Sequence, residues 1–198
     1  MGIPFEQRNF QKELDKKIAG FQKDGIVPTL LLHSCCAPCS SHCIEYLSDY
    51  FHITVFYYNP NISAEEEYRK RVDEFPAKYK VSFIEGDYDT KEFYDIAKGY
   101  EQCREGGERC FRCYELRLRK TCEVANAGGF DYFTTTLTIS PLKNSVKLNE
   151  IGLRLSEEYD MPYLLSDFKK KEGYKRSIEL SHEYNLYRQN YCGCVYSR

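Results

Sequence analysis

Cysteines gather in three short clusters along the sequence. They are Cys35, Cys36 and Cys39 with Cys43 one helical turn later, Cys110 and Cys113 of CFRC, and Cys192 and Cys194 of CGC. Thiolates bind zinc and iron–sulfur clusters, and a thiol whose pKa is lowered is a nucleophile. These clusters can therefore serve four chemistries: a disulfide framework, a zinc site, a catalytic thiol or an iron–sulfur cluster.

The composition is that of a globular cytoplasmic protein. Of the 198 residues, 42% are hydrophobic and 29% are charged, and no apolar run is long enough to cross a bilayer. The N-terminus, MGIPFEQRNFQKELDKK, does not have the pattern of a secretory signal. We therefore expect a cytoplasmic location and no membrane partner. Cytosolic thiols stay reduced, so the clusters predict metal binding or catalysis rather than disulfides, while the isolated Cys122 is predicted to lie in the core.

The number of clustered cysteines helps to choose between metals. Without Cys43, the clusters offer seven candidate ligands. A structural zinc takes about four ligands, whereas a 4Fe–4S cluster takes roughly three or four thiolates and leaves about three for a second metal. Seven thiolates therefore favour iron–sulfur chemistry, with zinc as the alternative. The radical-SAM spacing C-x3-C-x2-C is not completed, because His42 and Tyr46 stand at the third positions.

Apolar runs alternate with helical patterns, which predicts βαβ units and a mostly parallel sheet with helices on both faces. The predicted strands are 29–34, 52–60, 80–87, 130–137 and 161–167. The predicted helices are 38–50, 63–79 with Ser63 as N-cap, 90–100, 110–129, 142–159 and 177–190. We expect a single Rossmann-like (HUP-like) α/β domain over residues 1–198, with about five strands. Within it we expect an N-terminal helical extension at 1–27 and a C-terminal segment at 168–198 that closes the metal site.

The first cysteine cluster directly follows the first predicted strand. In open parallel sheets, ligands bind beyond the carboxyl ends of the strands, so we expect the metal site at those ends. In ATP-pyrophosphatases this position holds a glycine-rich phosphate loop, but no glycine stands between Ile26 and Glu85. We therefore expect no ATP site, and no direct use of NAD.

The clusters stand within longer motifs: LLHSCCAPCSS, YYNPNI with EYRKR, EGGERCFRCYELRL, FTTTLTISPLKN and SDFKKKEGYKRSIELSHEYNLYRQNYCGCVYSR. Together, from about Leu30 onward, these motifs resemble those of the epoxyqueuosine reductase QueH family. Each motif is weak alone, and the order CC-x2-C, C-x2-C and CGC makes the resemblance specific.

The resemblance implies an iron–sulfur-dependent oxidoreductase that acts on tRNA. The family removes the epoxide oxygen of epoxyqueuosine at the wobble position, the last step of queuosine biosynthesis, without cobalamin. The resemblance also implies a 4Fe–4S cluster beside a further iron, both held by the three cysteine motifs. The ligands carried over are Cys35, Cys36, Cys110, Cys113, Cys192 and Cys194, together with Cys39, where some relatives have aspartate. The implied partners are tRNA bearing epoxyqueuosine and an external low-potential electron donor of the ferredoxin or flavodoxin kind.

Deoxygenation of an epoxide to an alkene needs two electrons and two protons, and the oxygen leaves as water. His33, just before the first cluster, and Asp87, after the third predicted strand, are the candidates for proton transfer.

RNA binding requires a local basic patch, because the net charge of the chain is −2. The candidate RNA-binding residues are Arg109, Arg112, Lys169, Lys170, Lys171, Tyr174, Lys175 and Arg176. Cations with interleaved aromatic rings suit phosphate contacts and stacking on an unpaired base. A zinc-stabilised RNA-binding module without catalysis and a small electron carrier are the alternative interpretations.

Overall fold

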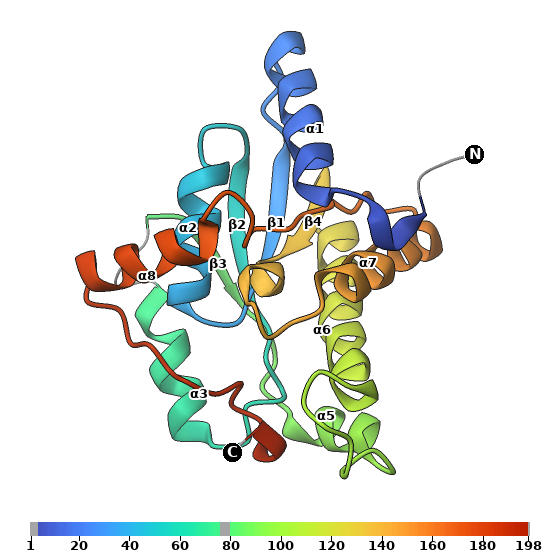
Figure 1. The fold of residues 1–198 in the computed structure, drawn as a ribbon, viewed down its shortest axis with the longest axis vertical. Coiled ribbons are helices and arrows are strands. Elements are labelled where there is room, and N and C mark those ends of the chain that lie inside the picture. The colour runs from blue at the N-terminus through green and yellow to red at the C-terminus, as the bar shows by residue number, and fades with distance from the viewer. Residues whose placement is uncertain (1–3, 76–79, 198) are drawn as a thin grey trace.

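A parallel sheet forms the centre of the molecule (Figure 1). The computed structural model describes residues 4–75 and 80–197. The strands are β1 (Thr29–Ser34), β2 (His52–Tyr57), β3 (Ser82–Glu85) and β4 (Tyr132–Thr135), in the order β3-β2-β1-β4. The chain adds strands on one side of β1 and then crosses to its other side for β4, so the order reverses between β1 and β4. Such a reversal opens a crevice at the carboxyl ends of the two strands, which is where the sequence predicts the site.

Strand β1 joins the two larger of the three hydrophobic clusters among the described residues. Leu30, Leu31 and Leu32 are all fully buried, but alternate side chains of a strand point to opposite faces. Leu30 and Leu32 pack into one core with side chains from α1 (Phe10–Asp24) and α2 (Ala37–Leu47). Leu31 packs into the other core with α6 (Glu108–Ala127) and α7 (Ser145–Tyr159). The predicted α/β fold with helices on both faces is therefore confirmed.

The predicted strand at 161–167 forms only a single bridge beside β4. Tyr163 bridges Phe133 in parallel, and the backbone N–H of Leu164 donates to the carbonyl of Phe133 at 2.9 Å. Pro162 has no N–H to donate, and the hydroxyl of Thr134 binds the carbonyl of Leu164 at 2.8 Å. The segment thus extends the sheet edge without completing a strand of its own.

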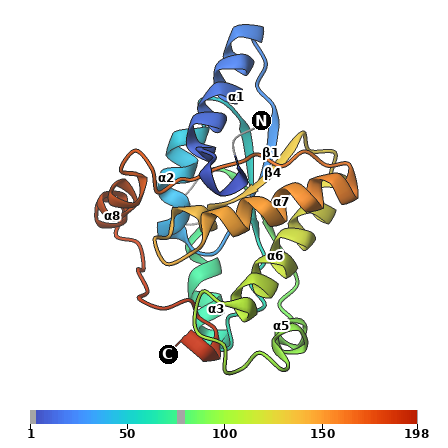
Figure 2. The ribbon, with the colours of Figure 1, turned by 45° about the vertical axis from the view of Figure 1, so that its right-hand side comes forward.

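Helices and loops collect beyond the carboxyl ends of the strands. Figures 1 and 2 show α3 (Glu65–Val72), α5 (Thr90–Ala97), the start of α6 and the C-terminal part of the chain at this end, while α1 extends at the other. The helix α8 (Gly173–Glu183) packs beside α2. Short 3-10 turns lie at Phe5–Gln7, Thr136–Ile139 and Val195–Ser197. None of the helices within the described ranges is both long and apolar enough to span a membrane.

The predicted helix 63–79 begins later than expected. Helix α3 starts at Glu65, with Ala64 at the N-cap position, and residues 76–79 lie outside the described part of the chain. Instead of capping the helix, the hydroxyl and the backbone N–H of Ser63 both donate to the carbonyl of Gly193, at 3.3 and 3.1 Å. A residue that resembles a helix cap therefore holds the C-terminal part of the chain in place.

Candidate metal centre

Three thiols meet at the turn between β1 and α2. Cys35 lies in a bend directly after the strand, Cys36 follows in extended backbone, and Cys39 lies in the first turn of the helix. The sulfur atoms of Cys35, Cys36 and Cys39 all lie within 4.8 Å of one another. In residues 4–75 and 80–197, no other group of three or more Cys, His, Asp or Glu side chains brings its ligand atoms so close. These three residues, the triad below, are arranged as ligands of one metal centre are.

Side-chain hydrogen bonds fix the backbone of this turn. The hydroxyl of Ser40 donates to the carbonyl of Cys36 at 3.0 Å, and it also contacts the hydroxyl of Ser34. The amide of Asn59, which follows β2, donates to the carbonyl of Ser34 at 2.8 Å. All these atoms are buried, so each bond satisfies a polar group that would otherwise be costly to bury. The triad therefore rests on a backbone that neighbouring strands hold in place.

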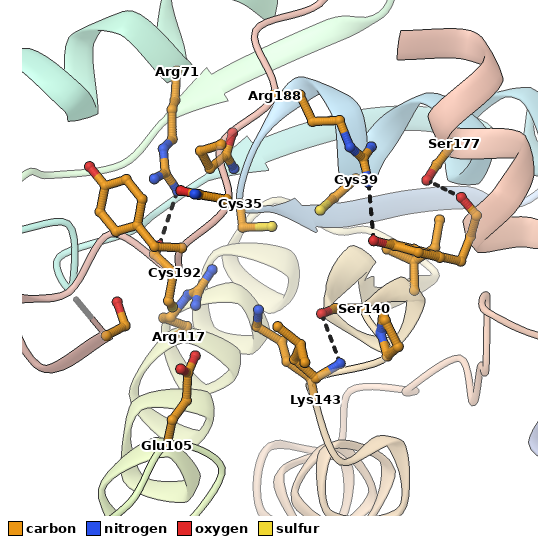
Figure 3. Close-up of a pocket in the computed structure, with 18 residues that line it drawn as sticks. Cys35, Cys39, Arg71, Glu105, Arg117, Ser140, Lys143, Ser177, Arg188 and Cys192 are labelled. Carbon is orange, nitrogen blue, oxygen red and sulfur yellow. Dashed lines mark hydrogen bonds between the residues drawn. The ribbon is translucent and has the colours of Figure 1, made fainter. Parts of the chain in front are cut away.

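The other four predicted ligands line an adjoining hollow. Cys110 and Cys113 lie on the first turns of α6, and Cys192 and Cys194 lie in the C-terminal strap, which we define as residues 184–197. Cys192 also lines the pocket that contains Cys35 and Cys39 (Figure 3). The fold thus brings the three cysteine clusters to one place.

A buried arginine fastens the strap above the triad. Nη1 of Arg71 on α3 donates to the carbonyl of Cys192 at 3.0 Å, and its Nε donates to Glu67 at 2.7 Å. Gly193 has a φ of +105°, and a Cβ there would lie 3.1 Å from both Nη2 of Arg71 and Cγ1 of Ile62. Only glycine combines this backbone conformation with so close an approach.

A second set of contacts, nearer the start of the strap, ties Tyr187 to α3 and to the residues that follow it. The hydroxyl of Tyr187 donates to Glu67 at 3.0 Å, and its backbone N–H donates to Glu74 at 2.6 Å. The ammonium of Lys70 lies 3.5 Å from the centre of the Tyr187 ring, within range for a cation–π contact. The position of Cys192 therefore depends on α3 as well as on the strap itself.

Two cations set the charge of the thiols. Hydrogen bonds from Cys36 and Cys39, with the charges of Lys143 and Arg117, hold the pKa of Cys35 well below its usual value although burial opposes this. A hydrogen bond from Cys194, again with Lys143 and Arg117, lowers the pKa of Cys192 against the same opposition. A metal ion bound nearby deprotonates further thiols.

The remaining candidate ligands have raised pKa values. The hydrogen bond to Cys35, together with burial, raises the pKa of Cys36 to about 12. Burial raises the pKa of Cys113 to about 11. One thiolate in each half of the site is therefore favoured before any metal binds, and the other thiols ionise only in exchange for a bound cation.

Arg117 lines the pocket and is held in place by polar partners. Its guanidinium donates to Asn59 and, at 3.3 Å, to Nε2 of His33. Burial lowers the pKa of Arg117, but its interactions with the neighbouring cysteines raise it by more, so Arg117 stays charged.

The predicted proton donors lie away from the pocket. His33 is fully buried, and its Nδ1 lies 2.8 Å from the hydroxyl of Thr135. Burial and Arg117 lower the pKa of His33 to about 3, so its ring is neutral near pH 7. Its Nε2 lies 3.3 Å from Nε of Arg117 and 3.1 Å from the carbonyl oxygen of Tyr58, so both ring nitrogens are engaged within the protein. Asp87 is exposed and lines a separate surface hollow beside β3.

Arg109 and Arg112 build the loop that precedes α6. Arg109 is buried, and its Nη1 donates to the backbone carbonyls of Tyr100 at 3.1 Å and Glu101 at 2.8 Å. Arg112 donates to the hydroxyl of Tyr100 at 2.6 Å and lies over its ring. The guanidinium of Arg109 therefore forms its hydrogen bonds within the protein, and the guanidinium of Arg112 forms at least one there.

Most cations of the segment 169–176 have carboxylate partners. The ion pairs are Lys169–Asp167 at 2.8 Å, Lys171–Asp15 at 2.6 Å, Lys175–Glu172 at 3.2 Å and Arg176–Glu45 at 2.6 Å. Lys170 has no ion pair with any described residue, and Tyr174 lines the pocket. Much of the predicted positive patch is therefore neutralised on the surface of the protein itself.

The pocket contains residues that the sequence did not mark as functional. Lys143, Leu142 and Ser140 follow β4, and Arg188 lies in the strap. In Figure 3, Arg188 lies near Cys39 and faces Lys143 and Ser140 across the pocket. Lys143 and Leu142 belong to the motif FTTTLTISPLKN, and Arg188 stands four residues before Cys192. Their position within or next to these motifs was the only feature of the sequence that could have indicated that these residues line the pocket.

Known proteins were compared with the chain. The family model that matches residues 30–198 is described as Epoxyqueuosine reductase QueH. The Epoxyqueuosine reductase QueH of Streptococcus pyogenes serotype M1 is 43% identical, over 98% of this chain and 80% of that protein. The protein of the same name from Thermotoga maritima is 38% identical, over 85% of this chain and 90% of that protein. The solved structure of the U34-tRNA thiolase NcsA from Methanococcus maripaludis with its 4Fe-4S cluster superposes with a TM-score of 0.43 at 12% identity, covering 88% of this chain and 73% of that chain.

Proposed function

The chain belongs to the epoxyqueuosine reductase QueH family, and from this membership we propose that it is an oxidoreductase that converts epoxyqueuosine to queuosine at the wobble position of tRNA. The observation that carries the proposal is the meeting of three distant cysteine clusters at the carboxyl ends of β1 and β4. The hydroxyl of Thr136, directly after β4, lies 4.0 Å from the sulfur of Cys35. The site therefore occupies the crevice where ligands of such sheets bind.

The residues around the pocket fit an iron–sulfur cofactor. Three thiols lie within 4.8 Å of one another, further thiols line the adjoining hollow, and Lys143 and Arg117 balance their negative charge. The proposed ligands of a 4Fe–4S cluster and of a further iron are Cys35, Cys36, Cys39, Cys110, Cys113, Cys192 and Cys194. When bound, these groups supply single electrons and a Lewis acid, and the chemistry uses no cobalamin.

The reaction adds two electrons and two protons to the epoxide. Both carbon–oxygen bonds break, an alkene forms and the oxygen leaves as water. The electrons come from an external low-potential donor of the ferredoxin or flavodoxin class. Lys143 lines the pocket with Cys35 and Cys192, whereas His33 and Asp87 do not, so its ammonium is better placed to donate a hydrogen bond to the epoxide oxygen.

The tRNA must present its modified base inside this pocket. Bases that undergo chemistry or specific recognition are taken out of the stack, and anticodon nucleotides are unpaired in free tRNA. The surface beside the pocket, with Lys170 and Tyr174 exposed, is the proposed contact for the anticodon arm.

Anaerobic turnover tests the proposal. Iron-loaded protein is incubated with tRNA that bears epoxyqueuosine and with a strong chemical reductant, and the nucleosides are then analysed. We expect queuosine to replace epoxyqueuosine, and we expect the protein to show a broad visible charge-transfer band. A colourless protein that contains only zinc and is still active would contradict the iron–sulfur part. Iron-loaded protein that leaves epoxyqueuosine unchanged would contradict the activity.

A further inference from the structure

Three side chains at the mouth of the pocket are exposed or lack a partner of opposite charge within the described residues. Leu142 is 71% exposed, the highest value among the large hydrophobic residues of the described chain. Glu105 and Arg188 both line the pocket, and neither forms an ion pair within residues 4–75 and 80–197. The segment 169–176 is different, since most of its cations are paired with carboxylates.

Arg188 is oriented although it has no carboxylate partner. Its Nη2 donates to the hydroxyl of Tyr174 at 3.3 Å, and its Nη1 donates to the hydroxyl of Ser181 at 3.3 Å. Its guanidinium also lies 5.5 Å from the centre of the Tyr174 ring. These neutral partners position the cation without neutralising it, so its charge remains available to an anion.

Glu105 lies on the opposite side of the pocket from Arg188. Figure 3 shows the two residues at opposite sides, with Cys35, Cys192 and Arg117 between them. Glu105 belongs to the loop that Arg109 holds through the carbonyls of Tyr100 and Glu101. The mouth therefore has a negative side and a positive side, with the apolar side chain of Leu142 at its rim.

A guanine-type nucleotide has the complementary polarity. Its base offers N–H donors on the Watson–Crick edge, its phosphates are anionic, and its face packs against apolar or aromatic side chains. A carboxylate only accepts hydrogen bonds, so it suits two neighbouring donors and disfavours the acceptor nitrogen on the corresponding edge of adenine. An unpaired guanidinium suits a phosphate.

We propose the residues by which this mouth recognises the wobble nucleotide: Glu105 accepts hydrogen bonds from the Watson–Crick edge of the base, Arg188 binds a phosphate, and Leu142 and Tyr174 pack against the base. The inference rests on the proposed function, because it names how the same pocket recognises its tRNA. It gives the strap a second task, since the segment that brings Cys192 to the pocket also brings the phosphate ligand.

Binding of unmodified tRNA tests the base contact. The probes are two transcripts that are identical except at the wobble position, where one has guanosine (a GUN anticodon) and the other has adenosine (AUN). We expect iron-loaded wild-type protein to prefer the guanosine transcript on the order of tenfold. Glu105→Gln, whose amide both donates and accepts, is expected to bring the ratio to within about twofold. Glu157→Gln, an exposed carboxylate outside the pocket, is the matched control and keeps the wild-type ratio.

Salt dependence tests the phosphate contact. Arg188→Ala is expected to weaken tRNA binding about tenfold and to reduce the slope of log affinity against log salt by about one phosphate contact. Leu142→Ala is expected to raise the KM for epoxyqueuosine tRNA several-fold with the salt slope unchanged. Arg104→Ala and Ile26→Ala, exposed residues outside the pocket, are the controls. Iron content and visible absorption of all these variants are expected to match the wild type.

The outcomes separate this inference from the proposed function. A wild-type protein that converts epoxyqueuosine and whose Glu105→Gln variant still prefers guanosine overturns the base contact alone. An unchanged salt slope in Arg188→Ala overturns the phosphate contact. If wild-type protein binds both transcripts equally, the inference is overturned, whether or not turnover is seen. If it clearly prefers the guanosine transcript but shows no turnover, only the proposed reductase activity is contradicted.

Discussion

The two groups of cysteines reach the pocket by different routes. Cys35, Cys36 and Cys39 lie on one strand–helix turn, and serines of that turn help to hold it, so local sequence places them within 4.8 Å of one another. Cys110 with Cys113 and Cys192 with Cys194 come from a helix start and from a strap that α3 must hold. One half of the site is therefore local structure, and the other half exists only through tertiary contacts.

The two halves share one electrostatic environment. In each group a hydrogen bond from a neighbouring cysteine, together with the charges of Lys143 and Arg117, lowers the pKa of one thiol, Cys35 or Cys192. The difference between the halves is thus in how they are assembled rather than in their charge. Variants that act on assembly and on ligands separately should distinguish the two.

The largest effect is expected when a ligand of the triad is removed. Cys35→Ser removes the thiol with the lowered pKa from the local half, so we expect loss of bound iron and a fall in turnover beyond the roughly 10–100-fold typical of outer-shell residues. Cys192→Ser is expected to lose turnover but to keep part of the iron, because the triad remains. Iron per chain, visible absorption and nucleoside analysis measure this.

The control for this pair is Cys43→Ala. Cys43 is buried in the core one turn after the triad, and its sulfur contacts the carbonyl of Cys39. We expect it to keep both iron and turnover. Equal loss of iron from the Cys35 and Cys192 variants would show that the two halves are not assembled separately.

An intermediate effect is expected when the strap is released. Arg71→Ala removes the donor to the carbonyl of Cys192, so we expect turnover to fall about 10–100-fold and the visible spectrum to change. Arg71→Lys, which keeps the charge but not the planar fork, should restore part of both. Faster hydrogen exchange in residues 184–197, with the exchange of β1 unchanged, would locate the effect. A spectrum and an exchange pattern like those of the wild type would disprove this role.

The smallest effect is expected for a cysteine outside both groups. Cys122 is buried in the core between α6 and α7, so Cys122→Ala loses packing alone. We expect a loss of about 1–2 kcal/mol in the free energy of unfolding, with iron content and turnover preserved. Denaturant unfolding measures the first and metal analysis the second. Loss of iron in this variant would contradict the division into ligands and core residues.

Patterns of local sequence were enough to predict the sheet and the place of the triad. The apolar run at Leu30, Leu31 and Leu32 predicts a strand covered on both faces, and the cysteines that follow it predict a site at its carboxyl end. The segment 161–167 has a similar composition but forms a single bridge, because Pro162 lacks a donor. The sequence thus predicts which segments form helices and strands better than it predicts the hydrogen bonds between them.

Partnerships between distant residues could not be predicted. Lys171 pairs with Asp15 and Arg176 with Glu45, and both acids lie on helices far away in the sequence. From its residue type, Arg109 could bind a phosphate, but its guanidinium donates hydrogen bonds to backbone carbonyls of the preceding loop. Whether a cation has a carboxylate partner depends on tertiary structure, and only the fold shows that Arg188 has none within the described residues while most cations of the segment 169–176 do.

The position of strand β1 between two cores implies that different parts of the molecule unfold with different free energies. Because Leu30 and Leu32 belong to one core and Leu31 to the other, neither core can come apart without the strand, and unfolding should proceed as one cooperative event. The triad begins where this strand ends, so its turn shares the protection of the whole domain. The strap is held by hydrogen bonds to α3 and by the buried side chains of Leu186 and Cys194, at the edge of the domain, so we expect its amides to exchange faster than those of β1.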